Sequence, residues 1–152
     1  MECKSKLREY RRDGFIISTD KARLDVPLIH EFLGLSSYWA QGRSLAVVEK
    51  SIEHSLCFGV YAPQGQVGFA RVVTDYATFG WLCDVFILPS YRGQGLSKWL
   101  VDCVVTDPEL QHVVRFLLAT RDAHGLYEQA GFVRREMMWR NPRQSSDPLA
   151  PR

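Results

Sequence analysis

The sequence lacks most features of secreted, membrane-bound or nucleic-acid-binding proteins. No apolar run approaches the roughly 18 residues that a membrane span needs, and the charged opening up to Arg12 contains no apolar stretch typical of a signal peptide. Nineteen basic and seventeen acidic residues leave a net charge of +2, too small for a chain held on nucleic acid by phosphate contacts. The few cysteines form no Cys-x-x-Cys pair and lack the ligand spacing of zinc: Cys3, Cys57, Cys83 and Cys103.

What remains is the composition of one folded domain. Of the 152 residues, 46% are hydrophobic and 24% are charged, enough apolar material for a sizeable core. Three cysteines lie inside apolar runs, which predicts buried, reduced thiols in a cytoplasmic protein with no metal, nucleic-acid or membrane partner. The basic opening and the Pro- and Ser-rich end resemble solvated tails. We expect an N-terminal extension at 1–14, one domain at 15–140 and a C-terminal tail at 141–152.

Hydrophobic periodicity predicts alternating strands and helices. Antiparallel strands come first, followed by strand, helix, strand, helix and strand. This order is typical of an α/β (α+β) fold, with a mixed, mostly antiparallel central sheet, flanking helices and one partly parallel pair. Asp25 is the expected cap of the first helix, which carries Ile29, Phe32 and Leu33 on one face. The expected strands are 15–18, 56–61, 66–73, 78–88, 115–120 and 132–139, and the later helices are 45–54, 96–105 and 123–130.

The most informative segment is a glycine-rich turn between a strand and a helix, residues 87–97. Such a turn directs several backbone N–H groups at one point, and the helix N-terminus adds partial positive charge, so the natural ligand is a phosphate. The turn lacks the Gly-Lys-Ser/Thr ending of a Walker A loop. Lys98 occupies the third glycine position of a dinucleotide fingerprint, which excludes that interpretation. An ordinary helix start after a β-turn is the structural alternative.

Two motifs resemble signatures of the GNAT superfamily of N-acetyltransferases. Arg92-x-x-Gly95-x-Ser97 is similar to the loop that binds the acetyl-CoA pyrophosphate, with serine where glycine or alanine is usual. The segment from Leu126 through Tyr127 to Gly131-Phe132 resembles the Leu-Tyr-x-x-x-Gly-Phe signature of the closing half. Tyr127 lies 127 − 92 = 35 residues after Arg92, a normal spacing for the family. The two motifs occur in the family's order and on matching elements.

The resemblance implies an enzyme that transfers acetyl from acetyl-CoA to a primary amine by direct attack in a ternary complex, without a metal. Homodimers are common in the superfamily. A non-catalytic acyl-CoA-binding module, or an interaction protein that uses the turn only structurally, would share the same motifs. By resemblance, the N–H near Ile87 binds the acetyl oxygen, and Ile87 and Leu88 pair with pantetheine. Thr120 takes a position where the family often has a cofactor-binding asparagine. The pyrophosphate would lie on the amides of Arg92, Gly93, Gln94, Gly95, Leu96 and Ser97.

The catalytic candidates are Tyr127 and Asp84. Tyr127 matches the family's general acid, and a phenol with a pKa near 10 is protonated at neutral pH; a buried tyrosine with a satisfied hydroxyl is the alternative. Asp84 lies in an otherwise apolar strand, where an unpaired carboxylate is costly. It either accepts the amine proton through water, attracts an ammonium substrate, or pairs with an arginine or a backbone amide. His124 is either a solvated helix residue or a cofactor contact, and Asp122 is a plausible cap for the helix at 123–130.

The acceptor site is expected from the first helices, their loop and the strand that carries Asp84. Arginine beside aromatic residues would suit an amine that also carries an aromatic or acidic part. The acceptor is thus a small primary amine, an amino acid, or a peptide or lysine amine. Core packing or surface exposure would explain the presence of each candidate residue equally well. The candidates are Tyr38, Trp39, Arg71 and Trp81, with Arg43 and Phe69 nearby.

Overall fold

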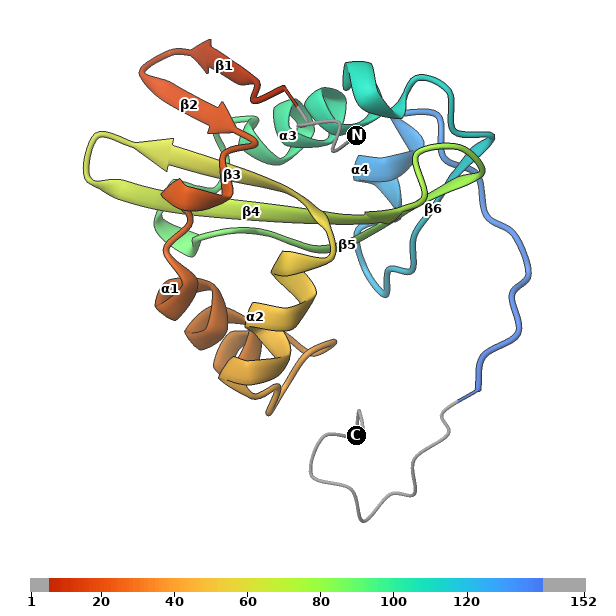
Figure 1. The fold of residues 1–152 in the computed structure, drawn as a ribbon, viewed down its shortest axis with the longest axis horizontal. Helices are drawn as coiled ribbons and strands as arrows, with labels where there is room; N and C mark the ends of the chain where they lie inside the picture. The colour runs from red at the N-terminus through yellow and green to blue at the C-terminus, as the bar shows by residue number, and fades with distance from the viewer. Residues whose placement is uncertain (1–5, 141–152) are drawn as a thin grey trace.

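A six-stranded sheet organises the computed structural model, which describes residues 6–140 (Figure 1). The strands follow one another across the sheet in chain order. Neighbouring strands are antiparallel except β5 and β6, which are parallel. The predicted mixed, mostly antiparallel sheet is therefore confirmed. The strands are β1 (Glu9–Arg12), β2 (Phe15–Ser18), β3 (Leu56–Ala62), β4 (Gly65–Thr74), β5 (Phe79–Ile87) and β6 (Arg115–Leu117).

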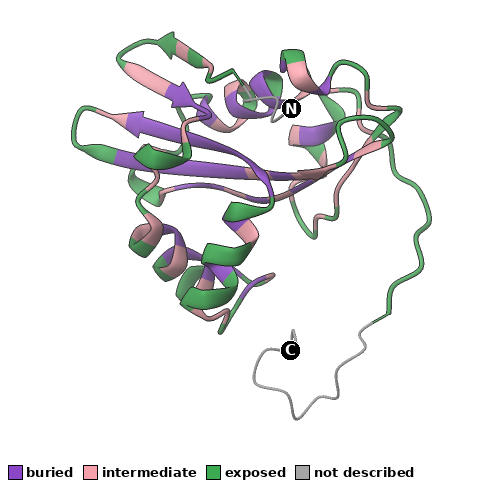
Figure 2. Ribbon diagram, viewed as in Figure 1, coloured by how far each residue is buried: buried purple, intermediate pink, exposed green. Residues whose placement is uncertain are grey.

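Helices cover both faces of this sheet and create two cores. Helices α3 (Leu96–Val105) and α4 (His124–Glu128) pack on one face, and α1 (Val26–Glu31) and α2 (Leu45–Glu53) pack on the other (Figure 1). The central strands are buried along most of their length (Figure 2). Parallel strands need a crossover connection, and α3 supplies it between β5 and β6. No helix within residues 6–140 is long and apolar enough to cross a membrane.

Side-chain caps begin α1, as predicted, and also α2, for which no cap was predicted. The Asp25 carboxylate accepts a hydrogen bond from the Leu28 N–H at 3.1 Å, and Ser44 caps α2 in the same way. These caps satisfy backbone donors that the first helical turn leaves unpaired. After α1 the chain continues through a π-helical turn at Phe32–Ser36. The predicted apolar face is confirmed, since Ile29, Phe32 and Leu33 are all buried.

The opening of the chain is more ordered than a solvated tail. Residues Glu9–Arg12 form the edge strand β1, which pairs with β2 around a tight turn at Asp13 and Gly14. Both turn residues have positive φ, 50° and 81°, which a two-residue hairpin requires. Arg8 Nε anchors this segment on the buried Asp107 carboxylate at 2.6 Å. Part of the expected extension at 1–14 therefore belongs to the sheet.

The predicted last strand at 132–139 is wrong. Gly131 ends the α4 segment with φ +90°, as predicted for a left-handed cap, but residues 132–140 form no strand. Strand β6 ends at Leu117 rather than Thr120 and offers a three-residue edge. Charged residues 134–136 interrupt the apolar pattern, and Met138 is 97% exposed. The segment therefore buries too little surface to join the sheet. The predicted tail at 141–152 lies outside the described residues.

Candidate active site

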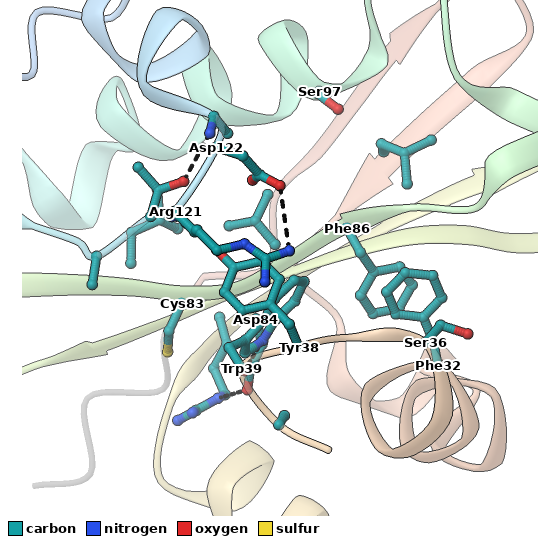
Figure 3. A pocket seen from close by; sticks show the side chains of 18 of the residues that line it. Phe32, Ser36, Tyr38, Trp39, Cys83, Asp84, Phe86, Ser97, Arg121 and Asp122 are labelled. Carbon is teal, nitrogen blue, oxygen red and sulfur yellow. Dashed lines mark hydrogen bonds and ion pairs between the residues drawn. The ribbon is translucent and has the colours of Figure 1, made fainter. Parts of the chain in front are cut away.

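The sheet opens between β5 and β6. The two strands pair only at Phe79, Gly80 and Trp81, so within the described chain the rest of β5 has no strand partner on that edge. A cavity of about 1000 Å³ lies at this opening (Figure 3). Residues 81–87 line one side of it, and residues 119–123 line the other. The opening exposes strand backbone that a ligand can pair with.

A β-bulge in β5 directs side chains into this cavity. Phe69 of β4 pairs with Phe86, yet Arg71 pairs with Cys83, so β5 carries one extra residue between these pairs. Asp84 lies in the bulge with φ +53°, a conformation that aspartate tolerates better than most residues. Residues 82 and 86 of a regular strand would point to the same face of the sheet. The extra residue moves the side chains that follow it to the opposite face. Leu82 therefore packs in one core, and Phe86 packs in the other, beneath α1 and α2.

Asp84 is the centre of a buried charge cluster. Its carboxyl Oδ2 accepts hydrogen bonds from Arg43 Nη1 and Arg71 Nε, each at 2.8 Å, and Oδ1 accepts one from the Trp39 indole N–H at 3.1 Å. Asp84 is only 4% exposed. Burial alone would lower the pKa of Arg71, but the charge of Asp84 opposes this, and the pKa is raised. Both carboxylate oxygens are thus engaged by three donor residues, two from the loop before α2 and one from β4.

The loop that carries Trp39 also spans the cavity. The Tyr38 hydroxyl accepts a hydrogen bond from the Arg121 backbone N–H at 2.9 Å, and the Arg121 guanidinium carbon lies 3.8 Å from the centre of the Tyr38 ring. Tyr38 and Trp39 meet edge to face with ring centres 5.1 Å apart. In Figure 3 Tyr38 lies between Arg121 and the Trp39–Asp84 contact. The loop after α1 and the segment before α4 are therefore joined across the cavity.

Tyr127 lies on α4 and lines the same cavity. Its ring is buried and packs edge to face against Phe132 with ring centres 5.9 Å apart. Its hydroxyl forms no hydrogen bond with any other described residue, so its proton is available to a ligand. Burial, with a smaller contribution from Tyr38, raises the pKa of Tyr127 to about 12. The phenol is therefore a fully protonated donor at neutral pH.

The glycine-rich turn leaves a row of amides unpaired. Gly93 and Gly95 have φ +79° and +77°, a region that costs an L-residue roughly 1–2 kcal/mol. Gly95 caps α3 without a side-chain hydrogen bond. Within the described part of the chain, no carbonyl or side chain accepts a hydrogen bond from the N–H groups of residues 93–97. These donors surround the N-terminus of a ten-residue helix, the geometry of an anion site.

Two backbone amides that the resemblance implied as cofactor contacts are already engaged. The Leu88 N–H donates to the Val67 carbonyl at 2.8 Å, and the Arg92 N–H donates to Pro89 at 3.3 Å. The Arg92 guanidinium folds back and donates from Nε to the Ile87 carbonyl at 3.0 Å. The N–H groups of successive strand residues point to opposite sides of the strand. Since the Leu88 N–H points toward β4, the Ile87 N–H points toward the open edge of β5. Ile87 therefore has the free amide that Leu88 and Arg92 lack.

The cavity gathers most of the residues singled out in the sequence. Leu88 and residues 93–96 of the turn do not line it, and Leu96 is a core residue. Phe69 is wholly buried beneath α1 and α2, and His124 is not a lining residue in the described chain, so neither contributes to the site. The candidates that line the cavity are Tyr38, Trp39, Arg43, Arg71, Trp81, Asp84, Ile87, Arg92, Ser97, Thr120 and Tyr127.

The cap of α4 differs from the prediction. Asp122 is exposed and lies 3.8 Å from Arg121 rather than bonding to the helix. The Thr120 hydroxyl instead accepts a hydrogen bond from the Ala123 N–H at 3.0 Å. The reason is that α4 begins at His124, which leaves the Ala123 N–H within reach of Thr120. Thr120 thus fixes the segment that forms one wall of the cavity.

Cys83 is a cavity residue that the sequence did not single out. Its apolar neighbours in the strand predicted a core cysteine, but the bulge places it half-buried on the cavity wall. Burial raises the pKa of the Cys83 thiol to about 12, so the reactive thiolate is scarce at neutral pH. Cys57 and Cys103 are free and buried. Within residues 6–140 no three His, Cys, Asp or Glu side chains gather to hold a metal ion.

We predict that Cys83→Ala keeps its acetyl-transfer rate within about threefold of the parent, because a protonated thiol supplies no nucleophile. The rate is measured as thiol release from acetyl-CoA by the variant, and the parent is assayed before and after iodoacetamide treatment at pH 7. Mass spectrometry reports whether Cys83 is alkylated. A loss of about a hundredfold in the variant, or an acetylated Cys83 during turnover, would indicate a covalent route.

Comparison with known proteins identifies the family. The acetyltransferase (GNAT) domain matches residues 53–134. A Gibberella zeae protein named as an acetyltransferase is 30% identical over 145 residues, 81% of each chain. The crystal structure of a GNAT-family protein from Xanthomonas campestris pv. campestris is 49% identical, with a TM-score of 0.81 over 84% of this chain and 92% of that one. A GNAT acetyltransferase from Elizabethkingia anophelis, solved with acetyl-CoA bound, shares the fold at 14% identity, with a TM-score of 0.64 over 82% and 80%.

The chain belongs to the GNAT family, and it is an acetyltransferase. The resemblance carried by the two sequence motifs is thereby confirmed. The matched region, 53–134, contains β3 to β6, α3 and α4. It therefore includes the open edge of β5, the glycine-rich turn and Tyr127.

Proposed function

We propose that this acetyltransferase moves the acetyl group of acetyl-CoA to a primary amine by direct attack, with both substrates bound in the cavity at the β5 opening. One observation carries the proposal. The open edge of β5 and Tyr127 line one cavity, and the turn with the unpaired N–H groups of residues 93–97 reaches the same cavity through Ser97. Together they supply a strand partner, an anion site and a proton donor for a thioester that carries a diphosphate.

The cosubstrate would lie along the opening. The pyrophosphate would accept hydrogen bonds from the amides of residues 93–97, and the pantetheine amides would pair with the free edge of β5 as an added strand does. The Ile87 N–H would donate to the thioester oxygen. Arg92, Ser97 and Thr120 line the cavity along this path. The Elizabethkingia anophelis relative, which shares the fold, was solved with acetyl-CoA bound, and this supports acetyl-CoA as the cosubstrate.

The chemistry follows from these positions. A neutral amine attacks the carbonyl carbon, a C–N bond forms, and the oxygen gains negative charge that the Ile87 N–H stabilises. The C–S bond then breaks, and the departing thiolate takes the proton of the Tyr127 hydroxyl. The amine loses its extra proton to water, and Tyr127 is reprotonated from solvent. The products are an N-acetylated amine and CoA with a free thiol.

Asp84 positions the acceptor side rather than removing the proton. A general base needs a free lone pair directed at the amine, either directly or through one water. Both oxygens of Asp84 already accept hydrogen bonds, two of them from arginines. These bonds fix Trp39 and Arg43 of the loop against Arg71 of β4. Of the three roles that the sequence left open, the arginine partner is the one that these contacts favour.

Two measurements test the proposal. Isothermal titration with acetyl-CoA reports binding, and thiol release across a panel of primary amines reports transfer. We expect binding and amine-dependent release, with the acetylated amine detected by mass spectrometry. Binding without release from any amine would contradict the transfer to amines and indicate a binding module. No binding at all would contradict the placement of the cosubstrate.

We predict that Gly95→Ala weakens acetyl-CoA binding about tenfold and lowers the free energy of unfolding by roughly 1–2 kcal/mol. Alanine at φ +77° is strained even though open space surrounds the site, so the turn would relax and its amides would diverge. Gly125→Ala is the matched control, because Gly125 lies in α4 with open space around it and ordinary helical φ. Alanine at position 125 should leave the acetyl-CoA affinity unchanged and should keep the free energy of unfolding or raise it slightly. Equal affinities in the two variants would contradict the anion site.

A further inference from the structure

We infer that the amine acceptor carries a carboxylate, bound by Arg43 and Arg71 on the wall of the cavity opposite the glycine-rich turn. The acceptor class is therefore an amino acid or a close analogue, rather than a simple alkylamine, a polyamine or an internal lysine of a protein. This inference rests on the proposed transfer to an amine and adds the acidic group that would select the acceptor.

The first argument is that both arginines have donors to spare. Arg43 binds Asp84 through Nη1 alone, and Arg71 uses Nε for Asp84 and Nη1 for the Ser55 hydroxyl at 3.0 Å. No other described residue accepts a hydrogen bond from Nε or Nη2 of Arg43, or from Nη2 of Arg71. Their side chains are 21% and 12% exposed, and both line the cavity. A planar guanidinium with two free donors matches a carboxylate bidentately.

The second argument is charge balance. Asp84 carries one negative charge against the two positive charges of Arg43 and Arg71, so this cluster keeps one uncompensated positive charge in a largely buried place. The other charged pair on the cavity wall, Arg121 and Asp122, has no net charge. Arg92 lies beside the turn assigned to the diphosphate. A buried charge without a partner is costly, and an anionic group on the acceptor would relieve that cost.

The third argument concerns which groups the cluster rejects. The indole N–H of Trp39 is already bonded to Asp84, so Trp39 offers the acceptor apolar ring surface and no free donor. The carboxylate beside these arginines, Asp84, already accepts three hydrogen bonds, which leaves it little capacity to hold a second ammonium. A polyamine would therefore meet net positive charge without a counter-ion. An amino acid would place its carboxylate on the arginines and its side chain against the aromatic surface.

The test compares matched pairs of acceptors that differ only in the acidic group. L-amino acids and their C-terminal carboxamides are assayed by thiol release at saturating acetyl-CoA. We expect kcat/KM to favour the acid over its amide by about 10- to 100-fold, the ratio that a charge-assisted hydrogen-bond pair provides. Arg43→Gln should reduce this preference to nearly one, mainly by raising KM for the acid. Arg43→Lys should retain part of this preference, because lysine keeps the positive charge but lacks the planar guanidinium that binds both carboxylate oxygens.

Arg134→Gln is the matched control, because Arg134 is exposed, pairs with Glu128 at 3.4 Å and lies outside the cavity. It should keep the full preference. Equal rates for acids and amides in the parent enzyme would overturn the inference while leaving transfer to amines intact, and this comparison needs no variant to fold. A preference that survives in Arg43→Gln and in Arg71→Gln would overturn the assignment to these two residues. Binding of acetyl-CoA with no release from any amine would instead overturn the proposed function.

Discussion

Tyr127→Phe is expected to lower kcat by about 10²- to 10⁴-fold. The substitution removes the hydroxyl that we propose as the proton donor to the leaving thiolate, and it keeps the ring that packs against Phe132. Acetyl-CoA affinity should therefore change little. Pre-steady-state thiol release measures the chemical step, and titration calorimetry measures affinity. An unchanged chemical step would contradict the role of Tyr127 as the acid.

A control and a pH profile sharpen this prediction. Tyr91→Phe removes a hydroxyl that bonds to Gln64 at 3.4 Å outside the cavity, and it should leave kcat unchanged. Because burial raises the pKa of Tyr127 to about 12, the protonated acid persists as pH rises through 10, where an ordinary tyrosine is half ionised. The parent kcat should show no loss from this group between pH 7 and 10. A fall in kcat with a midpoint near 9 in the parent but not in Tyr127→Phe would contradict the raised pKa.

Asp84→Ala is expected to lower the free energy of unfolding by about 3–5 kcal/mol. It would leave the guanidinium groups of Arg43 and Arg71 facing each other without their shared carboxylate, and it would place alanine at φ +53°. Urea unfolding measures the change. Asp122→Ala is the control, because its pair with Arg121 is exposed at 3.8 Å and should contribute less than about 1 kcal/mol. Equal effects of the two substitutions would contradict the buried cluster.

The milder Asp84→Asn separates positioning from proton removal. Asparagine tolerates the left-handed conformation and keeps one acceptor oxygen, so the fold should persist with some loss of stability. As a positioning residue, Asp84 should affect the acceptor KM more than kcat. A fall in kcat of about a hundredfold at unchanged acceptor KM, with the acid limb of the pH profile lost, would instead identify a general base.

Features that depend on short stretches of chain were predictable. The positive φ at Gly93 and Gly95 and the cap at Gly131 need glycine locally, and the helix at Leu96–Val105 follows from its apolar period. Tyr127 was found because the segment from Leu126 to Phe132 resembles a family signature at the family's usual distance from the turn. Resemblance to the family supplied its chemical role, and the fold placed it on the wall of the cavity.

Features that depend on pairing between distant segments were not predictable. The edge strand Glu9–Arg12 exists because β2 offers it a partner, and residues 132–139 form no strand because β6 offers them too short an edge. The sequence showed that Asp84 needs a partner but not which one. Arg43 and Arg71 are 41 and 13 residues away from it in the chain, and only the bulge in β5 brings all three together.

The amino-acid sequence by itself determined the class of fold and the glycine-rich turn, because each is encoded by local period or glycine conformation, and its resemblance to the family singled out Tyr127. The tertiary structure alone decided the charge cluster around Asp84. There a one-residue bulge selects the face on which Asp84 and Cys83 lie, and a loop after α1 brings Trp39 and Arg43 to them. Register and loop position are set by the packing of the whole sheet, which no short segment records.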